Sequence, residues 1–170
     1  MRENYEIKRT QTLVMIGIVT GLIATVTLII KIPSATGGYL NLSDFVIMVS
    51  PIMLPLGGAI FAAGVGCALA DIAGGYAVYA IFSLFIKAGE VIIIKLLERY
   101  LDTRQRWIPF SLAALWMMTM YGFVAVFLTK SWPAFFVALK GDLFQGVFAV
   151  ILATIFYPRL QKLMKYLRGN

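Results

Sequence analysis

Residues 13–30 read LVMIGIVTGLIATVTLII, an uninterrupted apolar stretch without a charged side chain. Lys8 and Arg9 precede it and Lys31 follows it. A bilayer core about 30 Å thick needs roughly 20 apolar residues for one helical crossing. The stretch therefore predicts a first membrane-spanning helix over residues 10–31.

The rest of the chain has the same character. Of its 170 residues, 61% are hydrophobic and only 14% are charged, and the mean hydropathy is +0.87. An ordinary soluble domain is far more polar. The composition predicts an all-α integral membrane protein with one domain, residues 1–170, and it excludes a separate soluble catalytic domain.

Five further spans follow from the apolar stretches and the residues that interrupt them. Pro55-Leu56-Gly57-Gly58 ends one helix and can open the next, so we place a tight turn there. The predicted bundle has six transmembrane helices, at residues 10–31, 43–56, 57–73, 76–97, 107–129 and 132–157.

Basic residues gather at three places on one side of this topology: the N-terminus, the connection between the fourth and fifth spans, and the C-terminus. Cytoplasmic loops are enriched in Lys and Arg, so both termini are expected in the cytoplasm. The same placement explains the net charge of +7 without a nucleic-acid partner. The residues are Arg2, Lys8, Arg9, Lys95, Arg99, Arg104, Arg106, Arg159, Lys162, Lys165 and Arg168.

The sequence also restricts the chemistry. It has no histidine and a single cysteine, Cys67, within an apolar segment. A transition-metal site, or a mechanism based on cysteine or histidine, is therefore not expected. We predict no cofactor and no catalytic residue.

Charged side chains at membrane depth are costly, so they are the first candidates for function. Lys87 and Glu90 lie on one face of the fourth span at i,i+3 spacing, where they can pair. One interpretation is a substrate contact, and the other is a purely structural ion pair.

More polar and aromatic residues flank the outer ends of the third, fourth and sixth spans. Together they predict one outward-facing pocket that is mostly apolar with a few polar groups. For Lys140 and Asp142 the alternative is that they reach out to the membrane surface. The set is Asp71, Tyr76, Tyr79, Lys140, Asp142 and Gln145.

The long connection after the first span is predicted to close over a ligand. Gly37-Gly38 gives it mobility, and Tyr39 and Asn41 are its candidate ligand contacts. The alternative is an ordinary connector in which Ser43 or Asp44 caps the second helix.

Small residues mark two helix faces. Gly17 and Gly21 form a small-xxx-small motif in the first span, which serves either packing within the bundle or docking of a partner helix. The third span carries a small residue at every fourth position, which we attribute to packing: Gly58, Ala62, Gly66, Ala70 and Gly74.

The order of motifs resembles the S components of energy-coupling factor (ECF) vitamin transporters, on the branch near the riboflavin, hydroxymethylpyrimidine and pyridoxine types. The resemblance covers roughly residues 10–160. It rests on GGYLNLSD at residues 37–44, PLGG at 55–58, ALAD at 68–71 with GGY at 74–76, and KAGE at 87–90.

This resemblance implies a multi-pass protein of the bacterial cell membrane that binds one vitamin near its outer surface. It implies no ATPase of its own, in keeping with the lack of a Walker motif. The expected partners are a membrane T protein, docked through Gly17 and Gly21, and two cytoplasmic ATPases. In the proposed family mechanism the whole bundle topples to deliver the vitamin.

Substrate and mechanism leave alternatives open. We favour hydroxymethylpyrimidine or pyridoxine, with riboflavin or another vitamin as the alternative. A self-sufficient secondary transporter would couple proton movement to Glu90 or Asp71, but the chain lacks convincing internal repeats. An intramembrane enzyme would use Lys87 with Glu90 or Asp142, but no nucleophile accompanies them.

Overall fold

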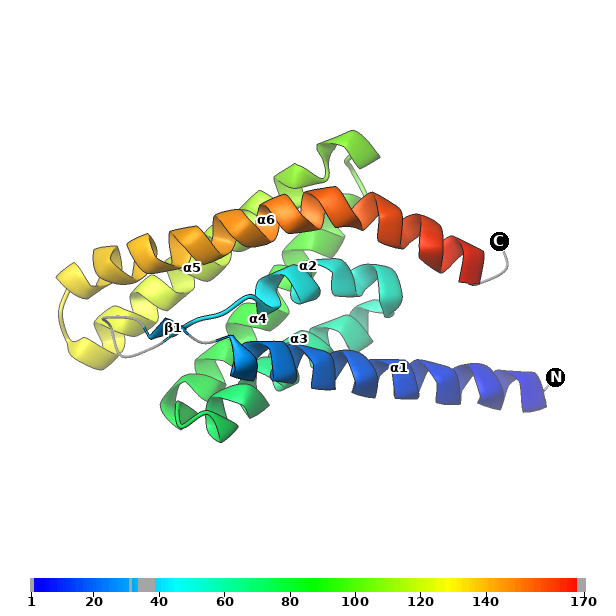
Figure 1. Ribbon diagram of the computed structural model, residues 1–170, viewed down its shortest axis with the longest axis horizontal. Helices are drawn as coiled ribbons and strands as arrows, with labels where there is room; N and C mark the ends of the chain where they lie inside the picture. Colours follow the sequence, from blue (N-terminus) through cyan, green and yellow to red (C-terminus); the bar gives the residue numbers. More distant parts are fainter. Residues whose placement is uncertain (1, 31, 34–38, 168–170) are drawn as a thin grey trace.

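The computed structural model describes residues 2–30, 32–33 and 39–167, and the side chains of residues 7, 9–30, 41–102 and 104–167. Within this part of the chain, six α-helices form a bundle (Figure 1). A short antiparallel pair of strands, β1 (Ile32–Pro33) and β2 (Tyr39–Leu40), follows the first helix. The helices are α1 (Arg2–Ile29), α2 (Ser43–Met53), α3 (Leu56–Ala73), α4 (Ala77–Glu98), α5 (Trp107–Thr129) and α6 (Pro133–Leu167), with a 3-10 turn at Thr103–Gln105.

Among the described residues, five helices are long and apolar enough to cross a membrane: α3, α4, α5, α6 and the Arg9–Ile29 part of α1. Helix α2 has 11 residues. At 1.5 Å per residue it is about 16 Å long, roughly half the thickness of the bilayer core. The all-helical membrane bundle is therefore confirmed with five long helices, and the predicted second span forms a shorter helix.

The short helix α2 lies inside the bundle. It packs against α6 and contacts α1, α3 and α4, and Figure 1 shows it between α6 and α1. Eight of its 11 residues are buried. Because protein surrounds it, its ends can meet irregular backbone without exposing unpaired polar groups to lipid.

The glycines of α3 bring this helix close to its two neighbours. A Cβ on Gly66 would lie 2.9 Å from the carbonyl oxygen of Thr20 in α1, and one on Gly64 would lie 2.7 Å from that of Leu84 in α4. Real Cβ atoms do not approach so closely. The small residues of α3 therefore allow the backbones of three helices to pack tightly, as small residues do in membrane proteins.

The outer surface of the bundle is apolar. Ile18, Phe85 and Phe144 are 59%, 65% and 65% exposed, while the polar Asp44 and Glu90 are fully buried. A soluble monomer rarely exposes such continuous apolar surface. Apolar side chains on the outside of the bundle and polar side chains in its interior are the arrangement expected of a membrane-embedded chain.

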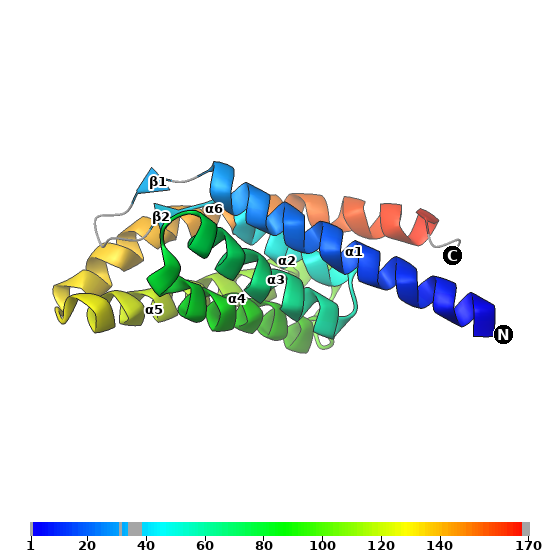
Figure 2. The ribbon, with the colours of Figure 1, turned by 90° about the horizontal axis from the view of Figure 1, so that it is seen from below.

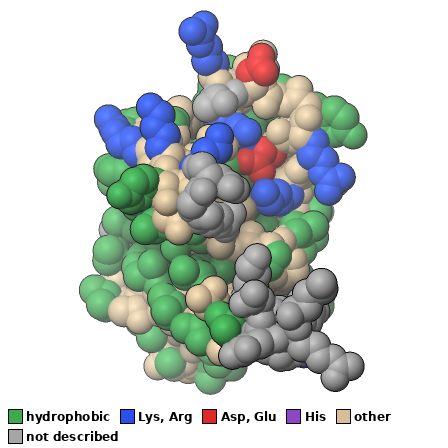
Figure 3. All heavy atoms as spheres, turned by 90° about the vertical axis from the view of Figure 1, so that its right-hand side faces the viewer, with side chains coloured by type: hydrophobic (Ala, Val, Ile, Leu, Met, Phe, Trp, Pro, Cys, Tyr) green, Lys and Arg blue, Asp and Glu red, His purple; other side chains and the backbone are tan. Residues whose placement is uncertain are grey.

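Both termini lie at the same end of the bundle (Figures 1 and 2). Lys and Arg side chains gather on this end, seen face-on in Figure 3. Helix α6 reaches this end because it continues through Pro158 to Leu167, ten residues beyond the predicted 157. Helix α1 begins at Arg2, before the predicted start at residue 10.

Candidate functional site

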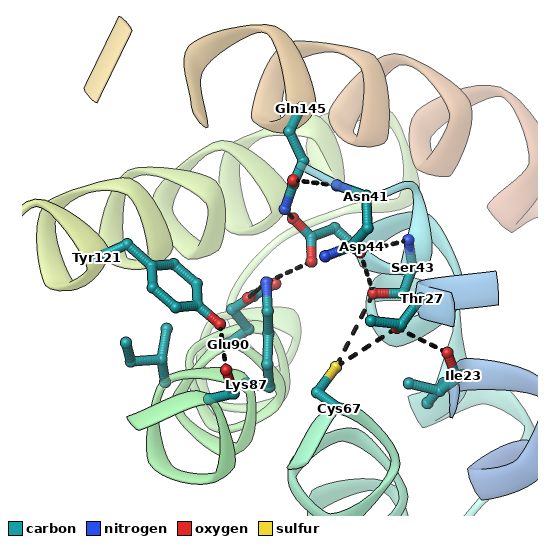
Figure 4. Close-up of polar contacts among 12 residues, drawn as sticks. Ile23, Thr27, Asn41, Ser43, Asp44, Cys67, Lys87, Glu90, Tyr121 and Gln145 are labelled. Atoms are coloured by element: carbon teal, nitrogen blue, oxygen red, sulfur yellow. Dashed lines mark hydrogen bonds and ion pairs between the residues drawn. The ribbon is translucent and has the colours of Figure 1, made fainter. Parts of the chain in front are cut away.

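Five polar residues meet in the middle of the bundle, and we call them the buried polar cluster: Asn41, Asp44, Lys87, Glu90 and Gln145 (Figure 4). Their exposed fractions are 9%, 0%, 1%, 0% and 3%. They come from the segment before α2 and from α2, α4 and α6. Because ionisable groups are expensive inside a membrane, such a cluster is the first candidate for a functional site.

Lys87 is at the centre of the cluster. Its Nζ lies 2.8 Å from Glu90 Oε1 and forms a second salt bridge with Asp44 Oδ1. The i,i+3 pair expected from the sequence is thus present, with an additional carboxylate from α2. Burying a single ion costs several kcal/mol, and both carboxylates help to offset that cost for Lys87. The salt bridge with Asp44 also joins α4 to α2.

Gln145 connects α6 to the same cluster. Its Nε2 donates to Asp44 Oδ2 at 2.6 Å, and its Oε1 accepts from the backbone N–H of Asn41 at 2.7 Å. Asn41 Oδ1 in turn accepts from the backbone N–H of Ser43 at 2.9 Å and from its hydroxyl. Both ends of the Gln145 amide are therefore fixed in orientation.

One acceptor of the cluster is left unused. Among the described residues, the buried Glu90 Oε2 has no hydrogen-bond partner, although Glu90 Oε1 accepts from Lys87. A buried carboxylate oxygen without a donor is unfavourable by roughly 1–3 kcal/mol or more. A donor group on a bound molecule would remove that penalty.

An aromatic side chain adjoins the cluster. Lys87 Nζ lies 5.4 Å from the centroid of the Tyr121 ring in α5, within the range of a cation–π contact. Tyr121 OH and Ser83 Oγ share a hydrogen bond of 2.8 Å. On the next turn of α5, Trp116 Nε1 donates to the carbonyl of Ile86 at 3.1 Å, which ties α5 to α4 at this level.

A weak polar branch leads from the cluster to α1. Cys67 Sγ lies 3.8 Å from Ser43 Oγ and 3.9 Å from Thr27 Oγ1 (Figure 4). Thr27 also donates to the carbonyl of Ile23 at 2.7 Å. Within the described chain, no group of three His, Cys, Asp or Glu side chains is arranged to bind a metal ion.

The remaining predicted site residues lie near the ends of α3, α4 and α6. Asp71 and Asp142 are buried, and the half-buried Tyr76 and Tyr79 meet edge to face at 6.4 Å between ring centroids. Lys140 is exposed, which favours its alternative interpretation as a surface-seeking side chain.

The predicted lid is the connection between α1 and α2. Gly37-Gly38 and the side chain of Tyr39 lie outside the described residues. The described ends of the connection pair as β1 and β2, with Ile32 opposite Leu40. The backbone then continues directly to Asn41 in the cluster.

Two residues at the site, Asp44 and Tyr121, were not predicted as site residues from the sequence. Asp44 was expected at most to cap α2, but the N-cap is Leu42, which makes no side-chain cap hydrogen bond, so the capping alternative is wrong. The Asp44 carboxylate instead binds Lys87 and Gln145. For Tyr121, a phenol in the middle of an apolar span was the available signal.

The chain is similar in sequence to known transporter proteins. The chain matches the family described as "ECF-type riboflavin transporter, S component" over residues 8–162. It is 27% identical over 131 residues to the "Thiamine precursor transporter HmpT" of Lactococcus lactis subsp. cremoris (strain MG1363), covering 77% of this chain and 75% of that protein.

A second relative matches a smaller part of the chain. The chain is 43% identical over 74 residues to an "Uncharacterized protein in gap 3'region" of Pyrococcus woesei, covering 42% of this chain and spanning about half, 49%, of that protein. The family match extends much further, over nearly all of the bundle, from α1 to α6. The chain therefore belongs to the family of ECF-type riboflavin transporter S components.

Proposed function

We propose that this protein is the substrate-specific subunit of an energy-coupling factor importer and that it binds one small vitamin or vitamin precursor at the buried polar cluster. The observation that carries the proposal is the convergence of Asp44, Lys87, Glu90 and Gln145 inside a lipid-exposed bundle. Polar groups of this kind inside a membrane typically line a substrate path.

The chemistry of the cluster favours a small heteroaromatic alcohol. Glu90 Oε2 is placed to accept a hydrogen bond from a ring amino or hydroxyl group of the substrate, and the Tyr121 ring offers an aromatic face. Lys87 supplies a donor. A mostly apolar site with a few placed polar groups is the usual form of a small-molecule pocket.

Hydroxymethylpyrimidine and pyridoxine are the preferred substrates on these grounds. The name of the Lactococcus relative, a thiamine precursor transporter, supports the pyrimidine. The family description names riboflavin, which is the alternative. Riboflavin carries a long polyol chain, and the cluster offers few further polar groups to bind one.

Transport is proposed to need partner proteins. The basic residues at the end with both termini would face the cytoplasm, so the substrate would enter from the opposite side. A T protein would dock on α1 at Gly17 and Gly21, and two ATPases bound to it would drive toppling of the bundle. The chain has no Walker motif with which to hydrolyse ATP itself.

Mass spectrometry of the purified protein tests this proposal. We expect hydroxymethylpyrimidine or pyridoxine to co-purify, or to bind with a Kd in the micromolar range or lower. A micromolar Kd corresponds to a binding free energy of about −8 kcal/mol. A retained riboflavin would support the alternative substrate. If no vitamin is retained and none binds, the proposed function is wrong.

The competing secondary transporter makes a different prediction. It would take up substrate in vesicles that contain this chain alone, driven by a proton gradient. The proposed subunit would instead accumulate substrate only with the T protein and both ATPases present. Uptake in vesicles without those partners would favour the secondary transporter.

A further inference from the structure

A cleft of about 270 Å³ opens near the end of the bundle where both termini lie. It is separate from the buried polar cluster and shares no residue with it. Its volume lies just below the range of roughly 300–1,000 Å³ that encloses a drug-sized ligand. The ends of three helices line it: Pro51 and Ile52 of α2, Lys95 and Glu98 of α4, and Tyr157, Gln161, Met164 and Lys165 of α6.

The one acid of the cleft is already surrounded by donors. Glu98 Oε2 lies 3.0 Å from Lys95 Nζ, while Glu98 Oε1 pairs with Arg106 and accepts from Tyr157 OH. The Arg106 guanidinium also lies 5.2 Å from the centroid of the Tyr157 ring. The two cations Lys95 and Arg106 therefore share the single carboxylate of Glu98, which leaves a net positive charge.

Further donors remain available beside this group. Lys165 and Gln161 are one helical turn apart on α6, both line the cleft, and neither has a hydrogen-bond or ion-pair partner among the described residues. Arg106, next to the cleft, has a buried Nε without a hydrogen-bond partner in the same part of the chain. The cleft therefore presents excess positive charge and free N–H groups.

One part of the cleft wall is apolar and is formed by the side chains of Pro51, Ile52 and Met164. The cleft lies at the level of the membrane surface, because Lys95 and Glu98 end a helix long enough to cross the bilayer. Apolar side chains beside basic ones in one cleft match an amphiphile with an anionic head group. Basic pockets between transmembrane helices on the cytoplasmic side bind the head groups of anionic lipids.

We propose that this cleft is a binding site for the phosphate group of an anionic phospholipid of the cytoplasmic leaflet. Lys165 and Lys95 contact the phosphate oxygens, Gln161 donates an amide N–H, and the acyl region lies along Ile52 and Met164. Glu98 is a positioning residue, since it fixes Lys95 and Arg106 around the rim. The site is independent of the vitamin and of the proposed transport function.

Native mass spectrometry of the full chain in an uncharged detergent tests the site, with phosphatidylglycerol and phosphatidylcholine as probes. We expect tighter retention of phosphatidylglycerol. Lys165→Gln should weaken it by about fivefold, the effect of one lysine near a lipid head group. Lys162→Gln is the matched control, because Lys162 is an exposed cation on the same helix that does not line the cleft.

Three results would overturn the proposal. The first is equal retention of both lipids. The second is an equal loss in Lys165→Gln and Lys162→Gln, which would show diffuse attraction to a basic surface. The third is full competition by inorganic phosphate at millimolar concentration, which would make a free anion the ligand. Both variants change exposed side chains, so they are expected to fold.

Discussion

Lys87→Met is expected to lower the free energy of unfolding by about 3–5 kcal/mol. The substitution leaves Asp44 and Glu90 buried, close together and without their shared cation. For a chain of this length such a loss corresponds to a fall in Tm on the order of 10 °C. Thermal unfolding of the purified protein in detergent measures it.

Lys95→Met is the matched control for this prediction. Lys95 is also in α4 and also pairs with a glutamate three residues later, but its side chain is 31% exposed against 1% for Lys87. Exposed pairs contribute about 0–1 kcal/mol. The triple variant Asp44→Asn, Lys87→Met, Glu90→Gln should regain most of the loss. Equal destabilisation by the two lysine substitutions would contradict the assigned role of Lys87.

Gly17→Leu and Gly21→Leu are each expected to reduce assembly with the T protein by roughly tenfold or more, since overpacking a close helix contact costs about 1–3 kcal/mol. Both glycines are exposed, and a Cβ on either would meet no heavy atom within 4 Å. The bundle itself should therefore tolerate the new side chains. Co-purification with the T protein and ATPases gives the readout, and vitamin binding by the chain alone should be unchanged.

Substitutions of two other glycines distinguish an effect on partner docking from an effect on folding. Gly57→Leu adds the same side chain on α3, where a Cβ also meets nothing, and it should leave assembly intact. Gly66→Leu should instead destabilise the isolated chain, because its Cβ would press on the carbonyl of Thr20. Unchanged co-purification of Gly17→Leu and Gly21→Leu would refute docking through this face.

Hydropathy predicted the helical membrane bundle, because lipid imposes long apolar segments. The limits of individual helices depend on tertiary packing. Proline usually ends a helix, yet Pro158 lies inside α6, which continues to Leu167. Helix α2 can be short because it lies inside the bundle. The helices that surround it include α4 and α6, which are distant in sequence, so the local sequence does not reveal this position.

The candidate site shows a similar division. The Lys87–Glu90 pair was predictable because both residues lie three apart on one helix. The contact between Asn41 and Gln145 joins residues 104 positions apart, so only the fold brings them together. Asp44, 43 positions from Lys87, resembled a helix-capping residue because acidic side chains near a helix start usually have that role.

Titration of purified wild-type and Glu90→Gln protein with hydroxymethylpyrimidine, pyridoxine and riboflavin will show whether the buried polar cluster binds the vitamin. Glutamine keeps the oxygen that accepts from Lys87 but removes the charged Oε2 acceptor. Hydrogen bonds to charged groups contribute about 1.5–3 kcal/mol, so we predict at least roughly tenfold weaker binding by Glu90→Gln of a compound that the wild type binds at micromolar Kd or better. Equal affinity of the two proteins, or no binding of any of the three compounds by the wild type, would contradict the proposal that the buried polar cluster binds the vitamin.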